Sequence, residues 1–114
     1  MKNDELLKIK KTLFNISDEL TISKGVGYGT EADTLANMRL ASVVDVCSPE
    51  VAAYVRLMDK VFRLGRFLKH KELPHEGLID TVVDAINYLT YIVAILVEDG
   101  KIELPEIEEG VGDR

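Results

Sequence analysis

The sequence predicts a small, soluble all-α protein that folds as a four-helix bundle-like domain. Apolar residues recur at steps of three and four along most of the chain, which is the spacing of one helical face. No segment alternates between apolar and polar residues as a half-buried strand does. At 114 residues, 46% of them hydrophobic and 30% charged, the chain has the length and composition of a single globular domain.

The first helix is expected to begin at Asn3 or Asp4, because both side chains cap helix N-termini well. Its apolar face then carries Leu6, Ile9, Leu13, Ile16 and Leu20. The residues around Gly25 predict its end, because glycine readily adopts the left-handed conformation that closes a helix. A shorter and less regular helix is predicted from about residue 33 to residue 46.

Ser48 and Pro49 predict the start of a third helix, as a capping hydroxyl followed by proline at the first helical position. This helix is expected to reach about residue 69. A fourth helix is expected from about residue 75 to residue 99, with Gly100 as its terminator. Its second half is apolar nearly all round, which predicts the central helix of the bundle or part of an oligomer interface. Residues 1–100 then form the domain, and the acidic tail 101–114 is expected to be extended or disordered.

The bulk properties exclude several classes of partner and site. A net charge of −6 argues against a nucleic-acid polymer, because proteins that bind one carry a basic surplus. Cys47 is the only cysteine, so neither an intrachain disulfide nor a cysteine-based zinc site is expected. The N-terminus has no apolar signal-peptide core, and the most apolar run is about half a membrane span. We therefore expect a cytoplasmic protein with no membrane partner.

The third helix carries a basic stripe, since Arg56, Lys60 and Arg63 follow one another at steps of four and three. Asp59 is spaced to pair with either arginine. One interpretation is an intrahelical ladder of salt bridges on a solvated face. The other is an anion site, because guanidinium groups bind phosphate oxygens bidentately and three cations outnumber one acid.

The fourth helix carries an acidic stripe, with Glu76, Asp80 and Asp84 at steps of four. Like charges at this spacing repel one another, so an opposite charge or a metal ion is expected beside them. Pairing with the basic stripe and binding of Mg²⁺ by these carboxylates are both consistent with the pattern. The glycine-rich stretch 25–29 matches no phosphate loop, and it predicts either a flexible turn or a ligand contact in which Tyr28 stacks on a base.

Four segments together resemble a family of small bacteriophage proteins: KGVGYG at 24–29, DTLANMR at 33–39, RLMDKVFRL at 56–64 and EGLIDTVVD at 76–84. That family is similar to the nucleotide modification associated domain and, more distantly, to the MazG-like all-α NTP pyrophosphatases. The resemblance implies a helical bundle that forms homo-oligomers, dimeric or higher, and binds nucleotide between its helices. The matching positions are Tyr28, Asn37, Arg39, Arg56, Asp59, Lys60, Arg63, Glu76, Asp80 and Asp84.

The sequence differs from the MazG-like enzymes in the acidic residues that hold Mg²⁺. Those enzymes use an ExxE pair on one helix and an ExxD pair on a later helix. Here Glu76, Asp80 and Asp84 have a different spacing, and no residues supply the first pair. A metal-dependent hydrolase needs enough carboxylates to fix the ion and orient water. The sequence therefore favours binding over catalysis, with no catalytic residue assigned and no cofactor required.

Three hypotheses follow, of which the first is favoured. The first is a phage protein that sequesters a nucleotide signal of bacterial antiviral defence, as a sponge does in the host bacterial cytoplasm. Its expected nucleotide-binding residues are Tyr28, Asn37, Arg39, Arg56, Lys60 and Arg63. The second is a Mg²⁺-dependent nucleoside triphosphate pyrophosphohydrolase, whose metal ligands are Asp59, Glu76, Asp80 and Asp84. The third is a helical interaction module without a small ligand, whose stripes are structural ion pairs.

Overall fold

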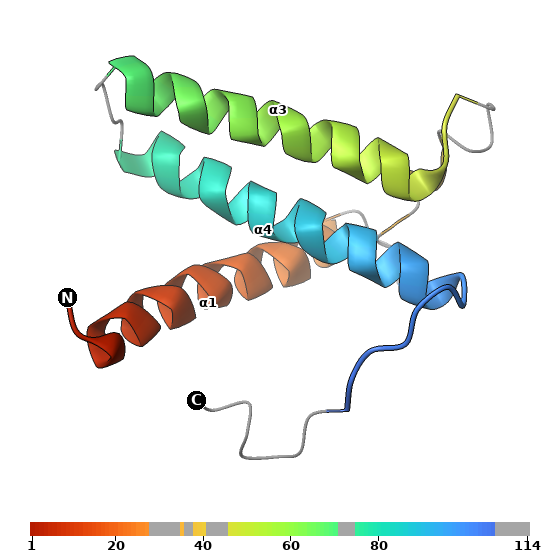
Figure 1. The fold of residues 1–114 in the computed structure, drawn as a ribbon, viewed down its shortest axis with the longest axis horizontal. Helices are drawn as coiled ribbons and strands as arrows, with labels where there is room; N and C mark the ends of the chain where they lie inside the picture. Colours follow the sequence, from red (N-terminus) through yellow and green to blue (C-terminus); the bar gives the residue numbers. More distant parts are fainter. Residues whose placement is uncertain (28–34, 36–37, 41–45, 71–74, 107–114) are drawn as a thin grey trace.

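A computed structural model describes residues 1–27, 35, 38–40, 46–70 and 75–106, with the backbone alone for residues 23–27, 75 and 76. These residues are all-helical in architecture, and none of them lies in a strand. Three long helices make up the fold: α1 (Asn3–Gly27), α3 (Pro49–His70) and α4 (His75–Glu98) (Figure 1). A short helical turn at 38–40 lies near the end of α4. The all-α prediction is confirmed, whereas the MazG-like bundle and the oligomer stay predictions.

The α4 helix is the centre of the arrangement. It runs antiparallel beside α3 along most of its length and crosses α1 on another side (Figure 1). Within the described part of the chain, α1 and α3 make no contact with each other. Because α4 packs against both neighbours, its apolar composition serves two helix–helix seams, and the prediction that it is the central helix is confirmed.

The start of α3 and the end of α4 lie where the sequence predicts them. The Ser48 carbonyl accepts the Ala52 amide at 3.0 Å, and Pro49 opens α3 in a buried position. At the same end of the hairpin, just after α4, Gly100 has a φ of 72°, in the left-handed region. The Lys101 amide reaches back to the Leu96 carbonyl at 2.9 Å, which satisfies a carbonyl that the end of α4 would leave unpaired.

The core lies where the first turns of α3 meet the last turns of α4. Ala53 and Ile95 have no exposed surface at all, and they pack with Leu35 and Met38 from the segment before α3. Tyr88, Tyr91 and Ile92 of α4 cover the cluster from the side. A small residue at position 53 allows the two helix backbones to approach closely at this point.

One buried hydrogen bond joins α1 to α4. The Ser17 hydroxyl donates to Oδ1 of Asn87 at 2.5 Å, and both residues are 5% exposed. Nδ2 of Asn87 is buried too and has no partner among the described residues. A buried polar pair of this kind orients the crossing of α1 and α4, because each group loses its hydration when it is buried.

Two sequence predictions differ from the structure or fall outside it. The α1 helix continues through Gly27, two residues beyond the predicted end at Gly25, because glycine permits a helix end without imposing one. The predicted helix 33–46 lies mostly outside the described residues, of which 38–40 are helical. In the tail, 101–106 is not helical, as expected, and 107–114 lies outside the description.

The apolar segment of α4 is also longer than the apolar run predicted from the sequence. The segment Gly77–Glu98 is long and apolar enough, by length and composition alone, to cross a membrane. The core helix of a water-soluble protein passes the same test. In this structure the segment packs between α1 and α3 and carries Asp80, Asp84 and the buried Asn87.

Loss of the Ser17 hydroxyl is expected to destabilise the crossing of α1 and α4. The variant Ser17→Ala leaves the buried Oδ1 of Asn87 without a donor, which costs about 1–3 kcal/mol of unfolding free energy. The double variant Ser17→Ala/Asn87→Leu removes both polar partners and should recover most of this loss. Urea unfolding followed by circular dichroism measures both. A double variant that is no more stable than Ser17→Ala would show that the hydrogen bond does not couple the two helices.

Candidate functional site

The basic stripe of the sequence becomes one edge of α3, next to the seam with α4. We call Arg56, Lys60 and Arg63 the cationic edge. Arg56 and Arg63 are exposed, and no ion pair involves either of them among the described residues. The two arginines are two helical turns apart, about 10 Å along the axis. Among the described residues, the edge therefore presents two guanidinium groups outside any ion pair, on successive turns either side of Lys60.

Lys60, in the middle of this edge, makes the one contact between the basic and the acidic stripes that the described residues contain. Its Nζ lies 3.3 Å from Oδ2 of Asp84. The side chains are only 17% and 27% exposed, so the pair is partly withdrawn from water. The predicted pairing of the two stripes is thus confirmed at one position. Since one carboxylate neutralises one of three cations, the edge keeps a local positive charge although the chain as a whole is acidic.

Two tyrosines of α4 lie beside this ion pair. The rings of Tyr88 and Tyr91 meet edge to face, with centroids 5.7 Å apart. Partial burial raises the pKa of Tyr91 above its usual value, and the nearby Tyr88 and the Asp84 carboxylate raise it further. Tyr91 is a neighbour that the sequence reading missed. The signal was present, because Asp84, Tyr88 and Tyr91 follow one another at steps of four and three.

The remaining acidic residues do not gather around Asp84. Asp59 and Asp80 are exposed, and the side chain of Glu76 lies outside the description. Among the described residues, no three acidic, histidine or cysteine side chains come together in a group that could hold a metal ion. The nearest partner of Asp84 is the Lys60 ammonium, which occupies one of its carboxylate oxygens.

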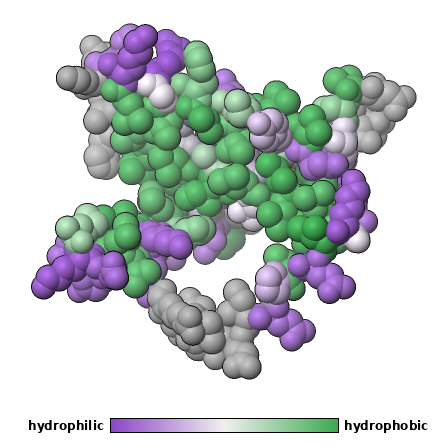
Figure 2. Space-filling view, viewed as in Figure 1, coloured by the Kyte–Doolittle hydropathy of each residue, from purple (hydrophilic) through white to green (hydrophobic). Residues whose placement is uncertain are grey.

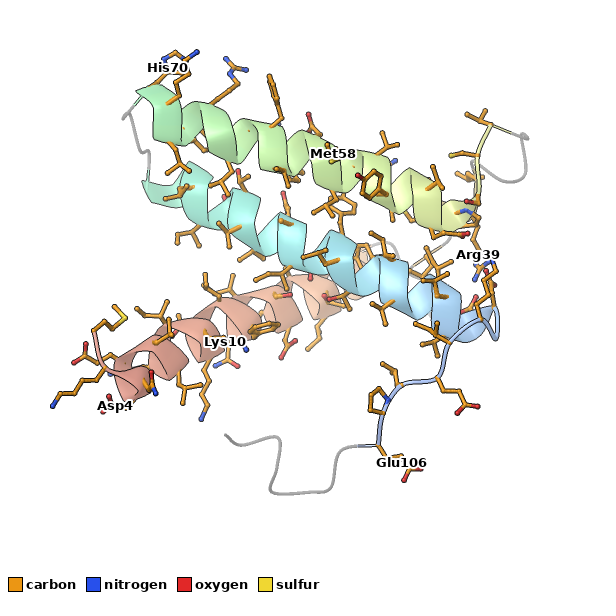
Figure 3. All side chains as sticks on the ribbon, viewed as in Figure 1. Asp4, Lys10, Arg39, Met58, His70 and Glu106 are labelled. Atoms are coloured by element: carbon orange, nitrogen blue, oxygen red, sulfur yellow. The ribbon has the colours of Figure 1, made fainter. Side chains whose placement is uncertain are left out.

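Arg39 lies far from the cationic edge and has partners of its own. Its Nη2 contacts Oε1 of Glu98 at 2.5 Å and Oδ1 of Asp99 at 3.2 Å (Figure 3). These carboxylates lie at the C-terminal end of α4, where a helix dipole favours a cation. Measured along α4, the level of Glu98 is about 21 Å from that of Asp84. Arg39 and the cationic edge therefore do not converge on one small ligand.

A second contact strengthens the same end of the hairpin. Lys101, just after α4, lies 3.3 Å from Oε1 of Glu50 in the first turn of α3. Hydrogen bonding to its own backbone amide lowers the pKa of Glu50, and the Lys101 ammonium lowers it further. The ion pairs of Arg39 and Lys101 hold the segments flanking α3 and α4 together, next to the core. The other predicted nucleotide contacts, Tyr28 and Asn37, lie outside the described residues.

Removal of the Arg39 guanidinium is expected to loosen the C-terminal end of α4. Arg39→Gln leaves Glu98 and Asp99 without their counter-ion, and the melting temperature should fall. Arg66→Gln is the matched control, because Arg66 is exposed on α3 and is in no ion pair among the described residues. Differential scanning calorimetry in low salt compares the two. Equal melting temperatures for both variants would remove the structural role assigned to Arg39.

Comparison with known proteins adds no relative. No protein-family model, no curated protein and no solved structure matches the chain. The resemblance to the phage proteins and to the MazG-like enzymes therefore stays a prediction from four short segments. What the site can do chemically follows from its own charges and contacts.

Proposed function

We propose that this protein binds a small phosphorylated nucleotide along the cationic edge of α3 and sequesters it without turning it over. The observation that carries the proposal is the pair of exposed guanidinium groups of Arg56 and Arg63 on either side of Lys60. Proteins hold phosphate oxygens with the forked guanidinium group of arginine and with positive charge that no neighbouring carboxylate neutralises. In a protein of net charge −6, three cations on one edge form a local exception.

The spacing of the edge defines the kind of ligand. The backbone positions of Arg56 and Arg63 are about 10 Å apart along the helix axis, which suits a ligand with two or more phosphate groups, one for each arginine. The buried seam beneath the edge lowers the local dielectric and strengthens each contact. The proposal also includes an aromatic ring that packs on a base: Tyr28, as the sequence predicts, or Tyr88, which lies beside Asp84 in the described structure.

Sequestration is proposed over hydrolysis because of the state of Asp84. A metal-dependent pyrophosphohydrolase needs this carboxylate as a ligand of Mg²⁺. Here its Oδ2 faces the Lys60 ammonium at 3.3 Å, an arrangement that positions a cation of the edge. The resemblance to the phage family supplies the ligand class of this proposal, a cyclic nucleotide signal of bacterial antiviral defence, with a linear nucleoside triphosphate as the alternative.

A nucleotide panel tests the proposal directly. The protein is incubated with canonical NTPs and with cyclic di- and trinucleotides, and the melting temperature is measured with each. Bound ligand is then released by denaturation and analysed by mass spectrometry. Stoichiometric recovery of intact nucleotide is the expected result. Catalytic formation of monophosphate and pyrophosphate would sink sequestration, and no stabilisation by any nucleotide would leave the interaction-module hypothesis.

Arg56→Ala is expected to weaken binding of the stabilising nucleotide at least about tenfold, because a charge-assisted hydrogen bond contributes about 1.5–3 kcal/mol. The fold should be unaffected, since the side chain is exposed and takes part in no ion pair among the described residues. Lys8→Ala, at an exposed lysine on α1, is the control for the loss of one positive charge. Isothermal titration calorimetry measures both. Equal affinities for the two variants would show that net charge alone attracts the ligand.

Asp84→Asn separates the two nucleotide hypotheses. Under sequestration the substitution frees Lys60 and removes a negative charge next to the phosphates, so affinity should rise several-fold. Under metal-dependent hydrolysis it removes a proposed Mg²⁺ ligand, and turnover should fall to background. Asp18→Asn, at an exposed position on α1, is the matched control. Titration calorimetry and a pyrophosphate-release assay on the same samples distinguish the outcomes.

A further inference from the structure

The α3 helix has a second face that the described residues leave exposed to solvent. Seven large apolar side chains along it are each between 44% and 70% exposed. We call them the apolar α3 face: Val51, Tyr54, Val55, Met58, Val61, Phe62 and Leu68. Figure 2 shows hydrophobic side chains gathered over α3 and α4 on the side in view, and Met58 lies near the middle of α3 in Figure 3. The face points away from the α4 seam, where Ala53 and Leu57 are buried.

The exposed area of the apolar α3 face is close to that of one side of a protein–protein interface. Half-exposed side chains of this size present about 100 Å² each, so the seven present roughly 700 Å². One partner in a standard protein–protein interface buries about 800 Å².

The sequence of the face has the seven-residue repeat of helix pairing. Val51, Met58 and Gly65 are seven apart, and Tyr54, Val61 and Leu68 are also seven apart, three residues later. When a second α3 packs antiparallel, one register places every member of the first set opposite a member of the second. It pairs 51 with 68, 58 with 61, and 65 with 54, in both directions. The face is thus complementary to itself about a two-fold axis.

Side-chain size favours this antiparallel register over a parallel one. A Cβ atom added at Gly65 would meet nothing within 4 Å, so open space lies there, and the antiparallel register fills it with the partner's Tyr54. A parallel pair would set Gly65 against its own copy and leave a void.

We propose that the protein is a two-fold symmetric homodimer in which the apolar α3 face packs antiparallel against the same face of a second copy. This interface lies on the opposite side of α3 from the α4 seam, and it does not depend on nucleotide binding. Met58 and Val61 lie nearest the axis, so each dimer contains two contacts between Met58 of one subunit and Val61 of the other. The cationic edges of both subunits stay open to solvent beside the paired helices.

Sedimentation velocity on the full chain tests the dimer. The wild-type protein should sediment at twice the 12.7 kDa monomer mass, and Met58→Glu should raise the dissociation constant at least about tenfold. Leu89→Glu is the matched control, because it adds the same charge at an exposed apolar position of α4 and should leave the dimer intact. Circular dichroism verifies that each variant is folded. A wild-type monomer at near-millimolar concentration, or dissociation by Leu89→Glu but not by Met58→Glu, would overturn the proposal.

A mixing experiment tests the register. Val61→Lys alone should dissociate the dimer as Met58→Glu does, because each buries a charge against an apolar partner. An equimolar mixture of the two single variants should form a heterodimer, since the new carboxylate then meets the new ammonium across the axis. A parallel pair would set position 58 against position 58 and gain no such contact. Native mass spectrometry that finds no heterodimer would overturn the antiparallel arrangement.

Discussion

The packing of α3 against α4 is the contact on which the rest of this structure depends. Ala53 and Ile95 are completely buried in it, and the small alanine side chain allows the two backbones to lie close together. Once this seam is formed, the rotation of α3 about its own axis is set. That rotation decides which α3 residues meet α4, which border the seam and which point to solvent. The candidate site and the proposed interface are both consequences of it.

The charged residues divide according to their distance from this seam. Lys60 and Asp84 border it directly, and they form a partly buried ion pair whose members constrain each other. Arg56 and Arg63, one turn to either side, have no such partner among the described residues. Arg39 and Lys101 instead meet carboxylates at the end of the hairpin, where they hold the flanking segments. Positive charge is therefore structural at one end of the molecule and open to a ligand along the middle of α3.

The small core explains why so much apolar surface is left outside. A chain of about 110 residues buries only part of its apolar side chains, and a three-helix arrangement centred on α4 has few enclosed positions. In this structure α4 contributes to two seams, whereas α3 contributes to one. Side chains such as Phe62, which is 70% exposed, are then left mostly uncovered by the described part of their own subunit. A second copy of the chain, packed as proposed, would cover this face, because the face is complementary to itself.

The sequence by itself determined the helical class, the boundaries of α3 and α4, and the residues that share a helical face. These are local properties, since proline and serine at 48–49, glycine at 100 and the three-to-four spacing act within a few turns of chain. The existence of a basic and an acidic stripe was readable for the same reason. Their pairing was only half predictable, because repulsion within the acidic stripe calls for a counter-charge without saying which cation supplies it.

Only the tertiary structure decided which members of each stripe meet. Lys60 rather than Arg56 or Arg63 faces Asp84, because the close approach at Ala53 sets the register of the hairpin. The separation of Arg39 from the cationic edge and the hydrogen bond from Ser17 to Asn87 have the same origin. Each joins residues far apart in the chain, so local spacing carries no information about it. Helix formation depends on residues that are neighbours in the chain, whereas contacts between helices depend on how whole helix faces pack.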